Sequence, residues 1–288
     1  MQLNNFRLTS LHRFTAAMAL IGTLSQASAV TTEAQDIYIS KNDQNVRVYK
    51  ADMILVSTLT NFNGPEGMAF DGSGNLYAAS RFGGITEDTS NGTFIKNINT
   101  PVAFTGLAFA KNGNLLGTNS SSVYEITTSG TLVRTTTNAG LNGAAGIVVD
   151  GAGNFFVASE FNHTGANDAI SEFSSSGTFI KTFGSETTNS DRWGLAFDTS
   201  GNLYMTDRNS SAINEYDPGT GTLIRTFSGL SGGMPGIAFD NAGNLWGANS
   251  GNIIEYAPNG TVIHSLSHIS FGGGDFIAAY SATNTPEP

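Results

Sequence analysis

The chain lacks cysteine, so no disulfide can stabilise its fold, whatever the redox state of its compartment. Charged residues are also scarce, at 12%, and 13 Lys and Arg stand against 23 Asp and Glu, for a formal net charge of −10 at pH 7. This acidic balance makes nucleic acid and anionic membrane surfaces poor partners. Stability must come from an apolar core, which a chain of 288 residues is long enough to bury.

No apolar run reaches the roughly 20 residues that a membrane-spanning helix needs, so we expect no integral membrane segment. The run from Phe14 to Leu24 follows Arg7 and Arg13 and precedes the small residues Ala27–Ala29. That order is typical of a secretory signal peptide. We therefore predict a signal peptide over residues 1–29, and a mature protein that is secreted to the periplasm, cell surface or extracellular matrix.

Glycine is abundant, and it marks a repeated phrase in which an apolar run meets a Gly-Asn turn and resumes as a second apolar run. The copies begin at Gly67, Gly106, Gly146, Gly194 and Gly236. Each copy predicts two buried strands that are joined by a tight turn.

A second hairpin follows each copy, as in Ile170–Lys181 and Ile253–His264. It turns at an Asn-Gly or Ser-Gly dipeptide, for which we expect the positive φ of a two-residue turn. Four strands in each unit of about 42 residues indicate a β-propeller blade.

The two ends of the chain complete each other. Phe271–Tyr280 supplies an inner strand with nothing after it, whereas residues 37–56 supply outer strands with nothing before them. We therefore predict an all-β, six-bladed β-propeller of four-stranded antiparallel blades over residues 30–281, closed by pairing the C-terminal inner strand with the N-terminal outer strands. Such closure leaves no open edge between the first and last blades. Residues 282–288 form a C-terminal tail.

The second hairpins also predict cross-strand ion pairs, because the turn places a glutamate opposite a basic residue in five units. The expected pairs are Glu87 with Lys96, Glu125 with Arg134, Glu172 with Lys181, Glu215 with Arg225, and Glu255 with His264. In the composite sixth blade both partners are lost together, because Val48 faces Ser57. We therefore interpret these glutamates as structural rather than catalytic.

The phrase Gly-x-Ala-x-Asp, then Gly-Asn-Leu-Tyr, Ile-x-Glu-Tyr and Gly-Thr-x-Ile, resembles the NHL repeat and its relatives, the gluconolactonase-like and streptogramin-lyase-like propellers. The resemblance covers residues 37–280 and implies the fold, whereas the functions of these families differ at the site. Thr285–Pro288 also resembles the start of a PEP-type (PEP-CTERM) sorting tail of some exopolysaccharide-producing bacteria. A chance match of that tripeptide stays open.

Chain direction separates two faces of the ring. If the Asp-x-x-Gly-Asn turns lie at the bottom face, the residues before the repeat glycines surround the channel at the top face: Glu66, Thr105, Ala145, Trp193 and Pro235. The resemblance to gluconolactonase-like propellers implies a divalent metal held by Glu, Asn and Asp, several of them at this position. Only Glu66 matches, and one carboxylate does not hold a hard cation. We expect no cofactor, with Ca²⁺ or Mg²⁺ at Glu66 as the alternative.

Further polar residues belong to the same top face. One equivalent position at the end of each second strand holds Ser80, Asn119, Ser159, Asp207 and Asn249. Glu160 and His163, in the longest loop, are the candidate acid-base pair. Our candidate ligand-binding residues are Glu66, Asn119, Trp193, Asp207, Arg208 and Asn249. The competing interpretation is a solvated loop surface of ordinary turn-forming residues.

Aspartates in the bottom turns have a similar ambiguity. Asp71 and Asp198 start Asp-x-Ser-x-Asn groupings that are similar to calcium loops, but the distal glutamate is missing. A hairpin Asx-turn, in which the carboxylate accepts backbone hydrogen bonds, is the favoured interpretation.

These observations favour a monomeric, non-enzymatic binding module at the cell surface or in the extracellular matrix, with a glycan, protein or small molecule as partner. The alternative is a metal-dependent hydrolase, lactonase-like, or a lyase that uses Glu66, Glu160, His163 and Asp207 on the top face. A purely structural matrix component is a third possibility.

Overall fold

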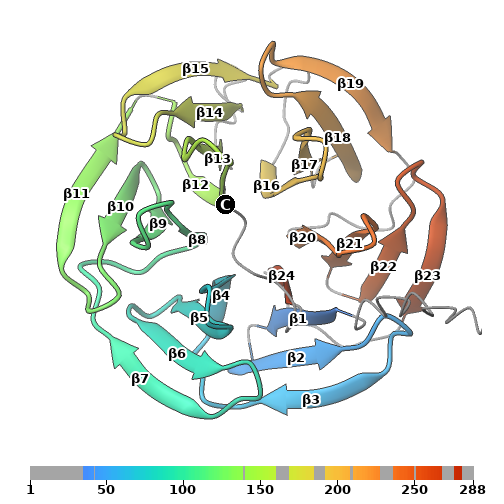
Figure 1. Ribbon diagram of the computed structural model, residues 1–288, viewed down its shortest axis with the longest axis horizontal. Helices are drawn as coiled ribbons and strands as arrows, with labels where there is room; N and C mark the ends of the chain where they lie inside the picture. Colours follow the sequence, from blue (N-terminus) through green and yellow to red (C-terminus); the bar gives the residue numbers. More distant parts are fainter. Residues whose placement is uncertain are drawn as a thin grey trace, which may run out of the picture. The chain divides into compact units, whose positions relative to one another are not determined.

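A computed structural model of the chain describes residues 35–41, 43–138, 140–159, 169–184, 192–207, 210–227, 236–249, 251–267 and 276–280. These residues form six antiparallel sheets of four strands each, arranged as blades around a central axis (Figure 1). The predicted all-β, six-bladed propeller is confirmed. Within the described ranges, no helix is long and apolar enough to cross a membrane.

The strands are named here by their rank within a blade. The inner strands of blades 1 to 6 are β4 (Pro65–Phe70), β8 (Leu107–Phe109), β12 (Ala144–Val149), β16 (Arg192–Phe197), β20 (Gly236–Phe239) and β24 (Ile277–Tyr280). The second strands are β5 (Asn75–Ser80), β9 (Leu115–Asn119), β13 (Phe155–Ser159), β17 (Leu203–Asp207), β21 (Leu245–Asn249) and β1 (Asp36–Lys41). The third strands are β6 (Ile85–Thr89), β10 (Ser122–Ile126), β14 (Ile170–Phe173), β18 (Ala212–Asp217), β22 (Asn252–Tyr256) and β2 (Asn45–Tyr49). The outer strands are β7 (Phe94–Ile98), β11 (Leu132–Thr137), β15 (Phe179–Phe183), β19 (Thr222–Phe227), β23 (Val262–Ser267) and β3 (Leu55–Leu59).

Blade 6 is built from both ends of the propeller, as the sequence predicts. Its strand order is β24-β1-β2-β3, and Ile39 of β1 pairs with Ile277 of β24. The backbone N–H of Ser40 also donates to the carbonyl of Phe276 at 3.0 Å. Strands from the two ends of the ring are thus hydrogen-bonded to each other, so the ring closes without a free inner edge.

The apolar core lies between blades rather than at the centre of the ring. Six buried clusters fill the six junctions, one between each pair of neighbouring blades. In the junction between blades 5 and 6, Trp246 and Ile253 pack against Ile37 and Ile39, all of them fully buried. Each blade is therefore held by the two beside it, and no blade has a core of its own.

The predicted glutamate registers are all present. Glu87, Glu125, Glu172, Glu215 and Glu255 face Lys96, Arg134, Lys181, Arg225 and His264, and Val48 faces Ser57. Each pair forms an ion pair or a hydrogen bond, for example at 2.7 Å between Glu125 Oε2 and Arg134 Nε.

These basic side chains also connect neighbouring blades. Arg134 donates to the carbonyl of Ser175 in the next blade, and Lys181 and Arg225 make the equivalent bonds to Pro218 and Pro258. At the junction of blades 6 and 1, Asn61 takes this role and donates to the carbonyl of Gly92 at 3.0 Å. The five glutamates and their basic partners therefore connect the third and outer strands within a blade. Three of the basic side chains also bind the turn of the next blade.

The turns of the second hairpins differ from the predicted two-residue form. In blade 1 the N–H of Gly92 donates to the carbonyl of Thr89, and only the glycine of the Asn91-Gly92 pair has positive φ. The register then shifts by one residue between Asp88 and Glu87. This is a reverse turn followed by a bulge, and the bulge restores the pairing of Glu87 with Lys96.

The repeat glycines are required by close approach of inner strands. A Cβ on Gly106 would overlap the carbonyl oxygen of Ala145, and one on Gly146 would overlap the carbonyl oxygen of Trp193. The N–H of Gly67 donates to the carbonyl of Thr105 in the next blade at 2.8 Å. The glycine thus lets neighbouring inner strands approach closely, although the N–H groups of Gly106 and Gly194 donate to the hydroxyls of Thr118 and Thr206 in their own blades.

Candidate functional site

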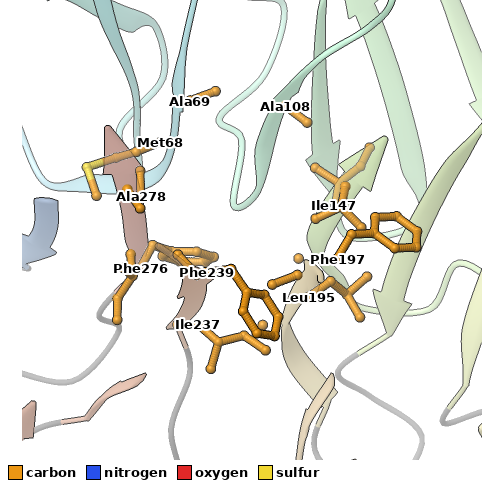
Figure 2. Close-up of a pocket in the computed structure, with 18 of the residues that line it drawn as sticks. Met68, Ala69, Ala108, Ile147, Leu195, Phe197, Ile237, Phe239, Phe276 and Ala278 are labelled. Carbon is orange, nitrogen blue, oxygen red and sulfur yellow. The ribbon is translucent and has the colours of Figure 1, made fainter. Parts of the chain in front are cut away.

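The central channel holds a cavity of about 510 Å³. Residues from all six inner strands line it, including Ala69, Ala108, Ile147, Ile237 and Ala278. Figure 2 shows these apolar side chains, with Phe197 and Phe239, around a common space. The cavity is therefore a property of the closed ring rather than of any single blade.

The lining follows directly from the repeat. In Gly-x-Ala-x-Asp the glycine and the alanine are small, and the inner strand presents its edge to the channel. The alternate residues, such as Met68 and Phe70, pack into the junction with the preceding blade. Small side chains on the inner strand leave room at the channel, while larger ones such as Phe197 and Phe239 both pack into the junctions and border the cavity.

The cavity reaches the bottom face, where polar groups surround it. Asp198, Thr199, Asp240, Asn241 and Gln35 belong to its lining. The Oδ1 atom of Asp198 accepts the N–H groups of Ser200 and Asn202, and Gln35 Oε1 accepts the N–H of Asn241. These polar atoms form hydrogen bonds within the fold, and they border a cavity whose lining is about equally polar and apolar.

The bottom aspartates form Asx-turns, as the favoured interpretation predicts. Asp71 Oδ1 accepts the N–H groups of Ser73 and Asn75 at 2.9 and 2.8 Å, and Gly74 has a φ of 85°. Asp240 does the same for Ala242 and Asn244, and its Oδ2 accepts the indole N–H of Trp246. The carboxylates stabilise the turns.

At the top of the channel, the ring of residues that precede the glycines is mostly without carboxylates. Its described members are Glu66, Thr105, Ala145 and Trp193. In blade 6 the strand register places Phe276 at the position of the repeat glycine, so the member from that blade is Asp275, which lies outside the described residues. The rings of Trp193 and Phe276 contact each other, with centroids 5.8 Å apart, and so connect blades 4 and 6, which are not neighbours.

Glu66 is the acidic member of the described part of this ring. It is half-buried, and burial raises the pKa of its carboxyl above the ordinary value, although the Arg81 charge opposes that shift. A bulge between Pro65 and Met68 carries Glu66 out of the regular pairing of β4 with β5. A carboxyl at this place can bind a ligand or serve as a proton donor.

The polar residues predicted at the ends of the second strands form hydrogen bonds within the fold. Ser80, Asn119 and Ser159 donate to the carbonyls of Asn63, Ala103 and Gly140, at 2.6, 2.7 and 2.8 Å. Each acceptor lies in the segment that leads into the inner strand of the same blade. Asp207 is buried, and its Oδ1 accepts the N–H of Ser210 at 3.3 Å.

Several predicted residues lie outside the described part of the chain. They are Glu160, His163, Arg208 and Pro235, together with the predicted signal peptide and the C-terminal tail. For Asn249 only the backbone is described, at the end of β21. Among the described residues, no three His, Asp or Glu side chains gather as they would around a metal ion.

Sequence reasoning missed the cavity and Phe276. The signal for the cavity was present in the repeat, because Gly-x-Ala recurs on the inner strands of blades 1, 2, 4 and 5, which face the channel. Phe276 was missed because blade 6 has no repeat glycine and Phe276 itself occupies that position.

Comparisons with known proteins agree with this architecture. A family model described as "Strictosidine synthase-like, N-terminal" matches residues 54–87. No curated protein matches the chain.

Solved structures match over most of the chain. A chain of a nidogen/laminin complex has a TM-score of 0.72 at 17% identity, covering 85% of this chain and 98% of that one. A Bacteroides caccae protein of unknown function has a TM-score of 0.67 at 14% identity, covering 85% and 98%. A streptogramin B lyase has a TM-score of 0.58 at 15% identity, covering 81% and 73%. The chain is therefore a six-bladed β-propeller of four-stranded blades, similar in fold to a chain of the nidogen/laminin complex and to streptogramin B lyase, as its NHL-like repeats indicate.

Proposed function

We propose that this propeller is a non-enzymatic binding module that works outside the cytoplasm. Its central channel holds a small organic molecule, or a projecting group of a glycan or protein. The observation that carries the proposal is the cavity of about 510 Å³ lined by all six blades. That volume lies within the range of about 300–1,000 Å³ that is typical of small-molecule sites.

The chemistry of the lining favours binding over catalysis. Its carboxylates, Asp198 and Asp240, accept hydrogen bonds from backbone N–H groups of their own turns. Carboxylates held in this way serve the turns and are poorly placed to act as nucleophile or base. The remaining lining combines aliphatic and aromatic side chains with Gln35, Thr199 and Asn241, so apolar contact and hydrogen bonds can both contribute to binding.

Charge restricts the ligand further. The chain has a formal net charge of −10, and two aspartates border the bottom of the cavity. A neutral or cationic group with an apolar body suits this environment better than an anion.

The solved structures are compatible with such a role. One chain that this protein resembles in fold belongs to a complex of nidogen with laminin. A propeller therefore serves well as a recognition scaffold, although fold alone does not assign the partner.

A neutral apolar dye, N-phenyl-1-naphthylamine, tests the channel. We expect its fluorescence to rise saturably with about one dye bound per chain, because the dye is small enough for the cavity. Ala108→Phe, which places a ring in the channel, should weaken binding at least about tenfold. Ser175→Phe adds the same ring at an exposed turn and should leave binding unchanged.

Two results would count against the proposal. One is a dye signal that never saturates, because nonspecific surface adsorption has no fixed stoichiometry. The other is equal binding by wild type and Ala108→Phe, provided that both proteins unfold at similar temperatures.

The metal-dependent hydrolase or lyase remains the second candidate, and Glu66 is the observation that favours it. Its carboxyl lies at the channel top with a pKa that burial raises. The described neighbours in its ring, Thr105, Ala145 and Trp193, add no carboxylate, and the blade 6 member, Asp275, lies outside the described residues. A hard cation there would need further oxygen ligands from elsewhere, so this candidate ranks below the binding module.

A further inference from the structure

The outer strands of the six blades share a pattern, and blade 6 departs from it. Each outer strand contains two adjacent, exposed apolar residues. In blades 1 to 5 the next residue is basic: Lys96, Arg134, Lys181, Arg225 and His264. In blade 6 the same position holds Ser57, which faces Val48 just as Lys96 faces Glu87. The edge of blade 6 therefore lacks the basic residue that the other five carry.

A basic residue on an outer strand matters because that strand is the edge of its sheet. An edge strand presents backbone N–H and C=O groups that can pair with another strand, and charged side chains discourage this pairing. Five edges of this ring are protected in that way. β3 is an edge strand without such a residue.

The edge of β3 also has a third exposed apolar residue, Ile54, directly before the strand. Ile54, Leu55 and Val56 are 59%, 47% and 48% exposed. β3 itself, Leu55–Leu59, contains no charged residue, proline or glycine. Consecutive aliphatic and hydroxyl side chains without charge are the composition that favours pairing of identical strands.

The charges around β3 identify the partner. The nearby basic residues of blade 6 are each matched by an acid: Arg47 contacts Asp43 at 2.9 Å, and Lys50 contacts Asp36 at 2.6 Å. The chain as a whole has a net charge of −10, so two copies repel over most approaches. At β3 the local charges nearly cancel, which makes this edge suited to a second copy of the same surface.

We propose that a second copy of this chain pairs its own β3 with this edge, in antiparallel register across a two-fold axis. Such a contact is self-complementary, as two-fold interfaces must be. It would join the two composite blades into one continuous sheet and cover Leu55 and Val56 of both copies. This proposal replaces the monomer that the sequence led us to expect.

Edge pairing alone buries less area than the roughly 1,200 Å² that stable interfaces start from, so the dimer should depend on protein concentration. Sedimentation velocity over a concentration series measures it. Wild type should shift from monomer to dimer, and hydrogen exchange at the β3 amides should slow in parallel. Ser57→Lys, which supplies the missing basic residue at an exposed position, should remain monomeric throughout.

A matched control separates this effect from added charge. Thr135→Lys places the same charge at an exposed position of β11, an edge that already carries Arg134, and should dimerise as wild type does. The reciprocal variant Glu87→Val with Lys96→Ser gives blade 1 the pattern of blade 6. It should associate beyond the dimer because it has two unprotected edges.

Three outcomes would overturn the proposal. The first is a wild type that stays monomeric at every concentration. The second is a dimer that Ser57→Lys leaves intact. The third is a monomer whose β3 amides are already protected from exchange, which would assign the edge to another part of the same chain.

Discussion

At the scale of single residues, Asp88 departs furthest from its counterparts. It follows Glu87, the paired glutamate of blade 1. At this position the other blades carry buried apolar or aromatic residues: Ile126, Phe173, Tyr216, Tyr256 and Tyr49. Asp88 is fully buried, and its Oδ2 accepts a hydrogen bond from Asn61 at 2.8 Å. Its Oδ1 has no hydrogen-bond partner. Burial raises the pKa of this carboxyl, and the Asn61 bond offsets only part of the shift.

Asp88→Asn should therefore stabilise the propeller at neutral pH. Above the raised native pKa, wild type carries a buried charge that the amide does not, so the variant should gain about 1 kcal/mol in unfolding free energy. Below the pKa of an unfolded aspartate, about 3.9, both side chains are neutral and the gain should disappear. Urea unfolding at pH 7 and near pH 3 measures both values.

The exposed Asp52→Asn serves as the control, since removing a solvated charge should not produce a gain at pH 7 that is lost near pH 3. If Asp88→Asn were no more stable than wild type at pH 7, the burial cost assigned to this carboxyl would be wrong.

The glutamate pairs show which structural features could be predicted from single residues of the sequence. Their registers were predictable because a glutamate and a basic residue recur at one spacing about a Gly turn, and a slipped register would separate every pair. Their bonds to neighbouring blades were not predictable, because these depend on how closely the blades pack.

Burial by itself raises the pKa of Glu125. Hydrogen bonds from Asn112 and Asn114, with the Arg134 charge, outweigh burial and hold the pKa below its ordinary value.

At the scale of the strand, the repeat glycine decides how tightly inner strands meet. Gly146→Ala should destabilise the protein by about 1–3 kcal/mol, because the added Cβ would overlap the carbonyl oxygen of Trp193 in the next blade. Thermal and urea unfolding measure the loss.

Gly151→Ala is the matched control for that change. A Cβ there would meet nothing within 4 Å, and its φ is not in the left-handed region, so stability should hold or rise slightly. Equal effects at Gly146 and Gly151 would show that chain entropy, and not contact between blades, explains the glycine.

The geometry of the turns in the second hairpins could not be predicted from the strand pattern. Asn-Gly and Ser-Gly pairs are compatible with both a two-residue turn and a reverse turn followed by a bulge, since each needs positive φ at glycine. The structure adopts the bulged form, in which the turn of one blade packs on its neighbour. Gly92, for example, lies against Leu59 of β3.

At the scale of the whole molecule, the number of blades and the closure followed from counting strands at the two ends. The cavity was harder to predict, because its lining comes from six strands that are far apart in the sequence. The sequence directed attention to the top face, where loops carry polar residues. The described polar residues there, such as Asn119 and Ser159, bond to the backbone, and the cavity opens toward the bottom face.

The central claim, a binding module rather than a metal-dependent enzyme, is tested most directly at Glu66. Metal content and thermal unfolding should be measured for wild type and Glu66→Ala, with and without Ca²⁺ or Mg²⁺. If the propeller is a binding module, we expect no stoichiometric ion and no rise in Tm that depends on Glu66. A bound ion that raises the Tm of wild type but not of Glu66→Ala would contradict it, because an ion held by the native state stabilises that state by mass action.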